Sequence, residues 1–507
     1  MTPTSRFLLS VLCLLAFSFA FAESMAQLPG ASGSFVEAFR FTQTFSTGTA
    51  RIQALGGAQT ALGADVSTLS ANPAGLGFFR KSEVSITPSL NYFSSETDYL
   101  SDQNNRDAKL NVGLNNAGVV FSFLKKDYHE GLWRGGNFGI SVSRVNNFQG
   151  TFEYDSPNPR NSLIDSYVEQ ANGTTTANFE TRRAVPATGT QLAYLSGLIS
   201  PVSFNADNTV YQSAFAGVQP RQSEKINSSG GQFQWNISYG ANLADVFYVG
   251  LSVGIVTVNY NVDKSYREQF GANPFTTFDR FNLKEQVATR GTGANATLGI
   301  IVRPISILRI GASATTPTYL AMQTDYSAQL ITGVTGSTAI ARLVPQRLNY
   351  NLLTPWRTSL GVALFVGKLG FLTASVEYID YTQMRVGDLN NNDFQVTNTL
   401  IKRSFRSVNN WQVGAELRLL RNQYLRGGFA YFPDPYSTNF DNFDRDVRSY
   451  SAGWGLRGEA GYFDITVVNS RFNADYAPYA LANQQQPRAA IEQNNFNLIM
   501  SFGVFFR

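Results

Sequence analysis

The sequence predicts an all-β fold: a 14-stranded antiparallel transmembrane β-barrel with an N-terminal hatch segment that plugs the lumen. Three observations predict this fold. Segments in which every second residue is apolar recur along the chain, and the connections between them are alternately short and long. The composition agrees, because 13% of the residues are aromatic and only 15% are charged, whereas soluble domains carry about 25% charged residues. A barrel that faces lipid outside and water inside has this composition.

Residues 1–22 are predicted to form a signal peptide. Arg6 precedes an apolar run at 7–21, and the small-residue pattern that signal peptidase requires ends at Ala22, with a second cleavage site after Ala26. No later stretch reaches the roughly 18 uninterrupted apolar residues of a membrane helix. We therefore expect an exported protein that lies in the cell outer membrane of a Gram-negative bacterium as a multi-pass β-barrel.

The two-residue alternation runs from residue 83 almost to the C-terminus. In one segment Val249 and Leu251 face one way while Gly250 and Ser252 face the other. The predicted strands are 83–93, 117–124, 137–148, 230–243, 247–261, 284–303, 306–329, 356–367, 369–383, 409–419, 424–432, 447–457, 460–473 and 495–506. Their number is even, as a closed barrel with both ends on one side of the membrane requires.

The connections support the strand assignment independently. Those that follow even-numbered strands are mostly short, at 241–245, 303–306, 367–368, 421–423 and 459–460, and the turn at 125–136 is the one longer exception. The long ones follow odd-numbered strands, at 94–116, 149–229, 262–283, 330–355, 384–408, 433–446 and 474–494. Short periplasmic turns that alternate with long extracellular loops are typical of membrane barrels, and nothing in a soluble sandwich would enforce them.

The longest predicted loop, 149–229, is too long for a simple connection. Two stretches in it could form short helices, and the second exposes the apolar side chains of Leu192, Leu195, Leu198 and Ile199. One interpretation makes these residues an apolar contact surface for a hydrophobic ligand at the outer rim. The alternative is that they only pack the loop against its neighbours.

Residues 23–82, between the signal peptide and the first strand, do not alternate. The segment is rich in small residues and is interrupted by glycines and by the turn Asn72-Pro73-Ala74-Gly75. So few strong elements cannot bury a core of their own, and the segment must therefore pack inside something larger. We predict that it is the hatch, and that residues 83–507 form the barrel.

The run ALGGAQTALGADVSTLSANPAGLG at 54–77 resembles the N-terminal signature of the FadL/TodX outer membrane transport family, which carries long-chain fatty acids and hydrocarbons. The matching hatch-motif residues are Gly56, Gly57, Asp65, Asn72, Pro73, Ala74 and Gly75, together with Ala58, Ala61, Ser67 and Thr68. The resemblance by motif covers the hatch, and over the rest of the chain it concerns only the architecture.

The resemblance implies a function. Hydrophobic ligands would be captured at the outer loops, pass into the hatch-plugged barrel, and leave sideways through a kinked strand. We therefore expect passive uptake of hydrophobic small molecules such as long-chain fatty acids. The alternative is a secretion-associated or structural outer-membrane barrel that binds a protein partner through its outer loops. In either case the barrel would contact outer-membrane lipid and lipopolysaccharide.

Several charged residues fall on the same strand face as small and polar residues, and this face is expected to point into the lumen. They are Arg309, Arg357, Glu377, Glu416, Arg418, Arg426 and Arg457. The five arginines are candidate partners for the carboxylate of a ligand, because a guanidinium pairs well with a carboxylate in a low-dielectric pocket. Alternatively, these side chains form ion pairs within the lumen or anchor the hatch.

Enzymatic chemistry is not expected. His129 is the only histidine, so neither a Ser-His-Asp triad nor a histidine metal site has its partners. The only cysteine, Cys13, lies in the signal peptide, which leaves the mature chain without disulfides. We predict no cofactor and no metal site. Lys and Arg are scattered and the net charge is only +4, so nucleic acid is not an expected partner.

Overall fold

The computed structural model describes residues 35–506 apart from 46, 101, 125–130, 182–185, 187, 272–278, 335–336, 388–393, 439, 442 and 483–485. The predicted signal peptide, both predicted cleavage sites and His129 lie outside the described residues.

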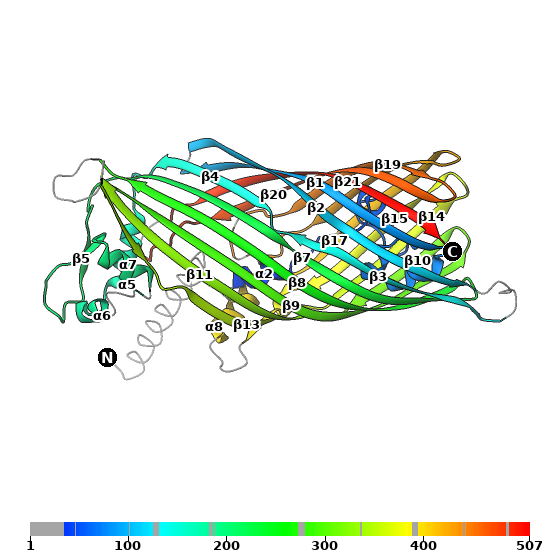
Figure 1. Ribbon diagram of the computed structural model, residues 1–507, viewed down its shortest axis with the longest axis horizontal. Coiled ribbons are helices and arrows are strands. Elements are labelled where there is room, and N and C mark those ends of the chain that lie inside the picture. The colour runs from blue at the N-terminus through cyan, green and yellow to red at the C-terminus, as the bar shows by residue number, and fades with distance from the viewer. Residues whose placement is uncertain are drawn as a thin grey trace, which may run out of the picture.

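The chain forms a closed 14-stranded antiparallel β-barrel, which confirms the predicted fold class (Figure 1). Three barrel strands are broken, so that two strands of the sheet together make one barrel strand. In chain order the wall consists of β1 (Ser82–Tyr99), β2 (Asp102–Leu124), β3 (Trp133–Asn147) with β4 (Gly150–Pro157), β7 (Arg221–Leu243), β8 (Phe247–Gln269), β9 (Arg280–Ile305), β10 (Leu308–Thr315) with β11 (Tyr319–Val334), β13 (Gln346–Leu353) with β14 (Arg357–Val366), β15 (Gly370–Asp380), β17 (Ser407–Leu420), β18 (Gln423–Phe432), β19 (Val447–Arg457), β20 (Gly461–Tyr476) and β21 (Ala489–Phe506).

The barrel closes between its first and last strands. β1 pairs with β21 from Ser82 opposite Phe506 to Tyr99 opposite Ala489. On β21 the alternation predicts the two faces correctly, because Val504 is exposed on the outside whereas Ser501 is buried.

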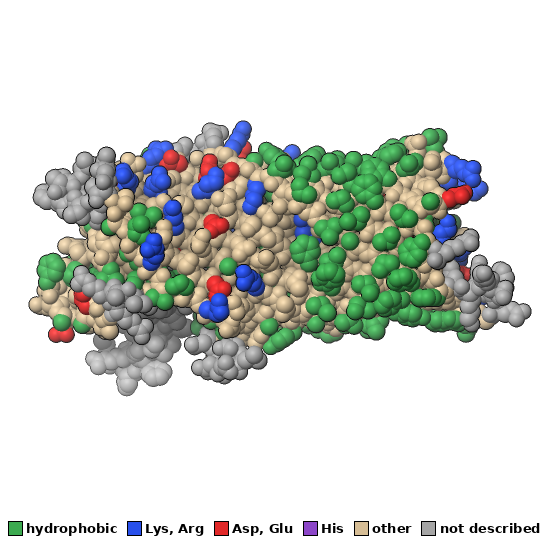
Figure 2. Space-filling view, viewed as in Figure 1, with side chains coloured by type: hydrophobic (Ala, Val, Ile, Leu, Met, Phe, Trp, Pro, Cys, Tyr) green, Lys and Arg blue, Asp and Glu red, His purple; other side chains and the backbone are tan. Residues whose placement is uncertain are grey.

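Outward-facing apolar side chains form a belt around the half of the barrel that carries the short turns (Figure 2). Exposed members of this apolar belt include Val84, Ile86, Phe121, Ile140, Trp235, Ile237, Val249, Leu251, Val253, Ile255, Leu298, Ile300, Leu360, Val362, Leu364, Val413, Leu417, Phe502 and Val504. On the face that Figure 2 shows, the other half of the outer surface is mostly polar and charged. Among the described residues, no helix is long and apolar enough to span a membrane.

Several strands extend well beyond the predicted ranges, and the corresponding loop predictions are wrong. The predicted loop 94–116 is mostly strand, since β1 reaches Tyr99 and β2 begins at Asp102. The predicted loop 149–229 contains β4 and the start of β7, and β13 lies within the predicted loop 330–355. The physical reason is that about 9–11 residues cross a bilayer, while β9 has 26. Beyond the belt the outward side chains of these strands are polar, while apolar side chains such as Phe281, Leu283 and Val287 of β9 face inward. The outward apolar period on which the strand prediction depends therefore ends at the edge of the belt.

The long loop between β4 and β7 folds over the outer end of the barrel (Figure 1). It contains α5 (Leu163–Ala171), α6 (Thr176–Glu180), α7 (Gly189–Leu195), β5 (Ile199–Pro201) and β6 (Tyr211–Ser213). Glu268 of β8 fastens this loop to the wall, because its carboxylate accepts hydrogen bonds from Ser162 Oγ (2.5 Å) and from the Leu163 backbone N–H (2.8 Å). Further outer elements are β12 (Ser337–Arg342), η2 (Tyr381–Gln383), β16 (Arg385–Gly387) and α8 (Gln395–Ser404).

The described N-terminal segment lies inside the barrel, as the hatch prediction requires. It comprises α2 (Phe35–Thr42), α3 (Ala50–Ala54), α4 (Thr68–Ala71) and η1 (Pro73–Phe78). Side chains on the inner face of the wall reach its backbone from many directions. Each of these side chains donates a hydrogen bond to a backbone carbonyl of the hatch. The pairs are Ser122 to Phe79, Asn137 to Leu76, Ser238 to Leu69, Thr373 to Ala58, Ser451 to Ala54 and Thr466 to Ala50.

Candidate functional site

Two buried polar residues of the hatch motif, Asp65 and Asn72, each hold a network of hydrogen bonds. Asp65 is buried and accepts hydrogen bonds from Thr49 Oγ1 (2.9 Å), from the Ser67 backbone N–H (3.0 Å) and from Ser67 Oγ (2.6 Å). Gly56 and Gly57 have φ angles of +64° and +83°, which side chains other than glycine rarely adopt. The spacing of Asp65 and these glycines in the motif therefore reflects how the hatch backbone folds back on itself.

Asn72 is the centre of the second hydrogen-bond network, which joins the hatch to the wall. It is buried, and its Oδ1 accepts from the Ala74 backbone N–H (3.2 Å), which caps η1. Its Nδ2 donates to the carbonyls of Thr60 (2.7 Å) within the hatch and of Ile300 and Ala312 (both 3.3 Å) in the wall. Pro73 and Ala74 follow it directly against β8, and Gly75 accepts from the Ala64 backbone N–H (3.2 Å).

The wall meets the hatch through a ring of glycines on its inner face. At each position a Cβ atom would lie less than 3.0 Å from a hatch atom. The glycine ring consists of Gly118, Gly139, Gly240, Gly250, Gly299, Gly311, Gly361, Gly414, Gly428 and Gly453. Because these glycines come from ten different strands, the hatch fills the lumen tightly around most of its circumference.

An ion-pair network holds the hatch on one side. Arg51 of α3 pairs with Glu416 (Nε to Oε2, 3.1 Å), and Arg426 pairs with Glu416 (2.7 Å) and with Asp464 (2.5 Å). The Arg426 and Asp464 side chains are almost completely buried. This arrangement corresponds to the alternative interpretation of the lumen charges, in which they anchor the hatch.

A large cavity of about 1960 Å³ lies on the other side of the hatch, toward the long loops. α2 contributes Phe35, Val36 and Arg40 to its lining, and β8 contributes Tyr260 and Val262. Many other lining residues are apolar, among them Phe93, Phe148, Phe152, Ile226, Val287, Phe432, Phe440, Val468, Phe472 and Ile499. The cavity is therefore suited to an apolar molecule.

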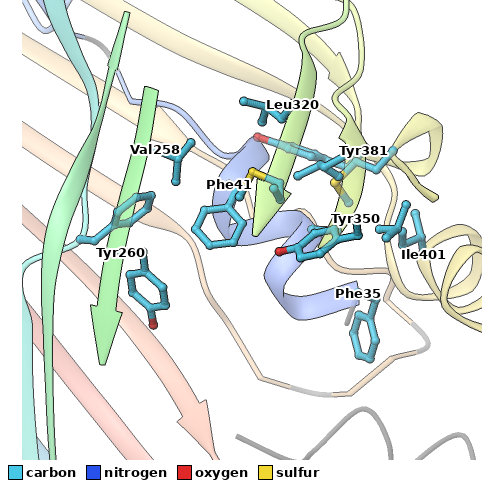
Figure 3. Close-up of a cluster of buried hydrophobic side chains, with 14 of the residues drawn as sticks. Phe35, Phe41, Val258, Tyr260, Leu320, Tyr350, Tyr381 and Ile401 are labelled. Atoms are coloured by element: carbon cyan, nitrogen blue, oxygen red, sulfur yellow. The ribbon is translucent and has the colours of Figure 1, made fainter. Parts of the chain in front are cut away.

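α2 is held in place by a large apolar cluster of the wall (Figure 3). Phe41 packs edge-to-face on Tyr260 with ring centroids 5.7 Å apart. Phe35 packs edge-to-face on Phe405, which directly follows α8, with ring centroids 6.1 Å apart. Glu37 accepts a hydrogen bond from the Tyr350 hydroxyl (3.4 Å). The helix thus forms part of the cavity wall and not a separate domain.

The cavity lining includes several cations that were not predicted from the sequence, among them Arg40, Lys264 and Arg144. Arg40 lies over the Tyr260 ring (4.7 Å), and Lys264 lies near the Tyr476 ring (5.5 Å). Arg144 of β3 donates hydrogen bonds to Ser89 Oγ (3.2 Å), to Asn91 Oδ1 (3.2 Å) and to Asn115 Oδ1 (2.5 Å). All three acceptors are neutral, and the structure places no ion-pair partner for Arg144 among the described residues.

None of the five arginines predicted as ligand partners lines this cavity. Arg426 belongs to the ion-pair network under the hatch. Arg309 lies between the rings of Phe78 and Phe365, with its guanidinium carbon 4.1 and 4.3 Å from their centroids. The structure therefore gives Arg309 a packing role next to η1.

The remaining three arginines also contact protein groups. Arg357 donates to Thr44 Oγ1 (2.6 Å) just after α2. Arg418 donates to the Arg421 carbonyl at the turn after β17, and Arg457 lies over the Tyr462 ring (4.9 Å). The structure thus brings Arg357 to the hatch segment and leaves Arg418 and Arg457 at the end of the barrel with the short turns.

The apolar residues predicted as outer-loop contacts lie mostly inside the loop. Leu192, Leu198 and Ile199 are buried in one apolar cluster with Tyr266 of β8, while Leu195 is partly buried. Their arrangement matches the alternative in which these side chains pack the loop against its neighbours.

The barrel wall has a break between β2 and β3. The ladder between them ends where Asn116 pairs with Ser143, although β2 continues to pair with β1 as far as Asp102. Past this point β3 and β4 pair only with β7 among the described strands. β4 turns inward beneath β1, where Ser95 Oγ donates to the Thr151 carbonyl (2.8 Å).

We call the part of the wall between β2 residues 109–115 and β7 residues 228–233 the window. Side chains bridge it. At its outer rim Lys109 Nζ donates to the Ser228 carbonyl (2.8 Å), and Lys225 pairs with Asp107 (3.0 Å). Arg144 lies behind the window, and the cavity lining includes both Asn115 and Ser228. The cavity therefore reaches the one edge of β2 that lacks a backbone ladder among the described strands.

The window could have been detected from the sequence by one signal. The alternation of β3 fails at Asn146-Asn147-Phe148-Gln149-Gly150, and the register against β7 shifts between Arg144 and Asn146. Arg144 falls on the outward face by counting, but the inward bend of β3 brings it under β1 and β2. For this reason, alternation along the strand does not identify Arg144 as an inward-facing residue.

The loop 433–446 borders the cavity on the outer side. Arg445 pairs with Asp441 (2.6 Å), and its guanidinium carbon lies 4.6 Å from the Tyr436 ring centroid. Hydrogen bonds from Arg445 hold the pKa of Asp441 below its usual value, and burial raises the pKa of Tyr436 to about 12. At neutral pH the carboxylate is therefore charged and the phenol is neutral.

No model of a known protein family matches the sequence, and no curated protein matches it. Solved structures do match over almost their entire length. The crystal structure of the Pseudomonas putida toluene transporter TodX is 10% identical, covers 91% of this chain and 99% of its own, and gives a TM-score of 0.54. That of a Pseudomonas aeruginosa FadL homologue is 13% identical, with coverages of 91% and 99% and a TM-score of 0.55.

A closed 14-stranded barrel with an apolar belt and a plugged lumen defines an outer-membrane β-barrel by fold. More particularly, the fold is that of the FadL and TodX transport barrels, and this confirms at the level of fold the resemblance drawn from the hatch motif.

Proposed function

We propose that the protein is an outer-membrane channel for the passive uptake of hydrophobic small molecules. The observation that carries the proposal is the path of the cavity, which ends on a tightly packed hatch but reaches the window between β2 and β7, where the β2–β3 ladder has ended. A ligand would enter between the outer loops and leave sideways into lipid, driven by its own gradient. On this proposal residues 1–22 are removed on export, 23–82 are the hatch and 83–507 are the barrel.

Burial favours such a path for apolar molecules. Each methylene removed from water gains about 0.8 kcal/mol, and the cavity offers many apolar side chains, including Phe93, Phe148 and Ile226. Outside the window, Leu110 and Val112 of β2 are strongly exposed on the face that carries the apolar belt. A departing ligand would pass from one apolar surface to another without crossing bulk water.

Chemical blockade of the window tests this path. Because the mature chain lacks cysteine, Ser228→Cys places a single thiol at the window's rim. We expect a bulky thiol reagent at this position to reduce uptake of a labelled fatty acid by cells several-fold, while a methylthio group has little effect. Ser265→Cys on β8, which lies outside the window and the cavity lining, is the matched control. Uptake that is insensitive to the bulky label at position 228 would contradict the lateral path.

We further propose that the carried molecules include long-chain fatty acids. The support is Arg144, a cation in the cavity that is surrounded by the neutral side chains of Ser89, Asn91 and Asn115. A buried cation with neutral partners gains from an anionic ligand, since charge-assisted hydrogen bonds are about twice as strong as neutral ones. A carboxylate at the window would complete the coordination of Arg144.

Replacement of Arg144 by glutamine should weaken fatty-acid binding about tenfold, because a hydrogen bond to a charged group contributes about 1.5–3 kcal/mol. The corresponding fatty alcohol should bind both proteins equally. The measurement is a fluorescence titration of the purified protein with each ligand. Arg457→Gln, which removes an arginine outside the cavity, should change neither affinity. An equal loss for acid and alcohol would argue against a carboxylate partner.

One observation favours the alternative function, the binding of a protein partner at the outer loops. Val202, Phe204 and Val210 lie next to β5 and β6 at the outer end, and the Phe204 side chain is 90% exposed. Crosslinking from position 204 in intact cells distinguishes the two functions. A specific protein adduct, together with unchanged fatty-acid uptake in cells that lack the gene, would favour partner binding.

A further inference from the structure

The outer face of the barrel has a groove of about 570 Å³ on four adjacent strands, β8, β9, β11 and β13. The strand registers arrange its outward side chains in rows. One row consists of Asn259, Arg290, Gln323 and Asn349, and the row nearer the short turns consists of Thr257, Thr292, Ala321 and Asn351. Every side chain of the first row is polar, and Arg290 is the only cation in either row.

The groove lies at the boundary of the apolar belt. The next row toward the short turns is Ile255, Ala294, Tyr319 and Leu353, of which Ile255 and Tyr319 are about half exposed. Outward residues in successive rows of a strand are about 6.6 Å apart. The groove therefore lies within one or two rows of a surface that would contact acyl chains.

The inner side chains of this part of the wall pack toward α2, which leaves a recess on the outer face. Met322 and Tyr350 are buried in the cluster that also contains Phe41. Gly291 lies directly against Met322, where a Cβ atom would collide with the Met322 sulfur. The outward neighbours Thr257, Thr292 and Ala321 are small, so the recess is not filled from outside.

The charge of the groove is positive. Arg290 is exposed and forms no ion pair with any described residue. The next row beyond it carries Asp325, which both Arg290 and Arg347 attract electrostatically, but the ion pair of this carboxylate is with Arg347 (Nε to Oδ1, 2.6 Å). The three groups together keep one net positive charge. Asn259 and Gln323 flank Arg290 on the two neighbouring strands, and Asn349 follows on the next strand. The Gln323 Nε2 donates to Asp325 Oδ2 (3.4 Å), so its Oε1 and the amides of both asparagines are the further hydrogen-bonding groups of the row. This combination fits a group that has both phosphate and sugar oxygens.

We propose that this groove binds the phosphorylated glycolipid of the outer leaflet, with a phosphate on Arg290, sugar oxygens on the neighbouring amides, and acyl chains over Ile255, Tyr319 and Leu353. The site rests on the outer-membrane location proposed above, but it does not depend on which molecule the channel carries. Guanidinium groups bind phosphate through paired hydrogen bonds. The belt below the groove supplies the apolar contacts that a soluble phosphate compound would lack.

The test uses the intact purified barrel in detergent and a defined probe, bis-phosphorylated lipid A. Native mass spectrometry measures the fraction of protein that carries the lipid at a fixed lipid concentration. Arg290→Gln should weaken binding about tenfold, as the loss of one charge-assisted contact to phosphate implies. The matched control is Arg471→Gln, an exposed outward arginine of β20 that lies above the belt and outside the groove.

The probes separate the two sources of phosphate. Lipid A without its phosphates should bind the unaltered protein about as weakly as intact lipid A binds the Arg290 variant, and millimolar inorganic phosphate should not compete. Equal binding of lipid A by the unaltered protein and the Arg290 variant would overturn the proposal. So would an equal loss in the Arg290 and Arg471 variants, which would indicate a general charge effect. Fatty-acid uptake should be unchanged in the Arg290 variant, so a failure here is distinct from a failure of the channel function.

Discussion

Replacement of Gly428 by valine is expected to lift the hatch from the wall and to make the barrel conduct ions. Gly428 belongs to the glycine ring, and a Cβ atom there would collide with the backbone of Leu55 and Gly56. A backbone contact cannot move aside as the end of a flexible side chain can, so either strand or hatch must shift. Overpacking of this kind costs about 1–3 kcal/mol.

The neighbouring residue supplies the control for this prediction. Gly427 points outward on the same strand, and a Cβ atom there would meet no atom closer than 4.0 Å. Gly427→Val should therefore remain sealed. The measurements are single-channel conductance in a planar bilayer and the temperature at which the folded barrel unfolds. A Gly428→Val barrel that is as stable and as tightly sealed as the Gly427→Val barrel would show that the hatch does not depend on the glycine ring.

Replacement of Arg426 by methionine should destabilise the folded protein by about 3–5 kcal/mol, because it leaves buried carboxylates without their partner. Asp464 loses its only ion-pair partner among the described residues, while Glu416 keeps Arg51. The measurement is the free energy of unfolding in urea. Fatty-acid affinity of the folded fraction should stay the same, since Arg426 does not line the cavity.

A compensated variant separates the lost charge balance from the lost packing. Arg426→Met combined with Asp464→Asn removes the unpaired charge and should recover a large part of the stability. If the double variant is as unstable as the single one, packing of the Arg426 stem and not its charge would account for the loss. A loss of fatty-acid affinity in the single variant would instead restore Arg426 as a ligand partner.

The fold was accessible from the sequence because the belt enforces it. Val249, Leu251 and Val253 must face an apolar environment at every second position, and such a pattern survives in a single sequence. Strand ends beyond the belt were missed because no such constraint acts on their outward side chains, as the polar outward face of β9 at residues 280–290 illustrates. The hatch was accessible for a different reason, since Asp65, Asn72 and the glycines around them serve the backbone of the hatch itself.

The cavity could not be predicted in the same way. Its cations come from unrelated places, among them Arg40 on α2, Arg144 on β3 and Lys264 beyond the belt on β8. By its position in β3 Arg144 would face outward, and only the bend of β3 brings it inside. Conversely, Arg426 follows the parity rule and does point inward, but the carboxylates that neutralise it lie on two other strands. Parity gives the direction of a side chain and does not give its partners.

The contacts of the hatch also constrain when the lumen can be sealed. The backbone N–H of Ala50 donates to Ser501 Oγ (2.7 Å), a contact between residues 451 positions apart in the chain. Thr466 of β20 donates a hydrogen bond from its Oγ1 to the Ala50 carbonyl (2.7 Å). Contacts so distant in sequence form late, because a long loop must first be closed. The hatch therefore reaches its final position only when the last strands have formed, because the contacts of Ala50 with Ser501 and Thr466 need those strands.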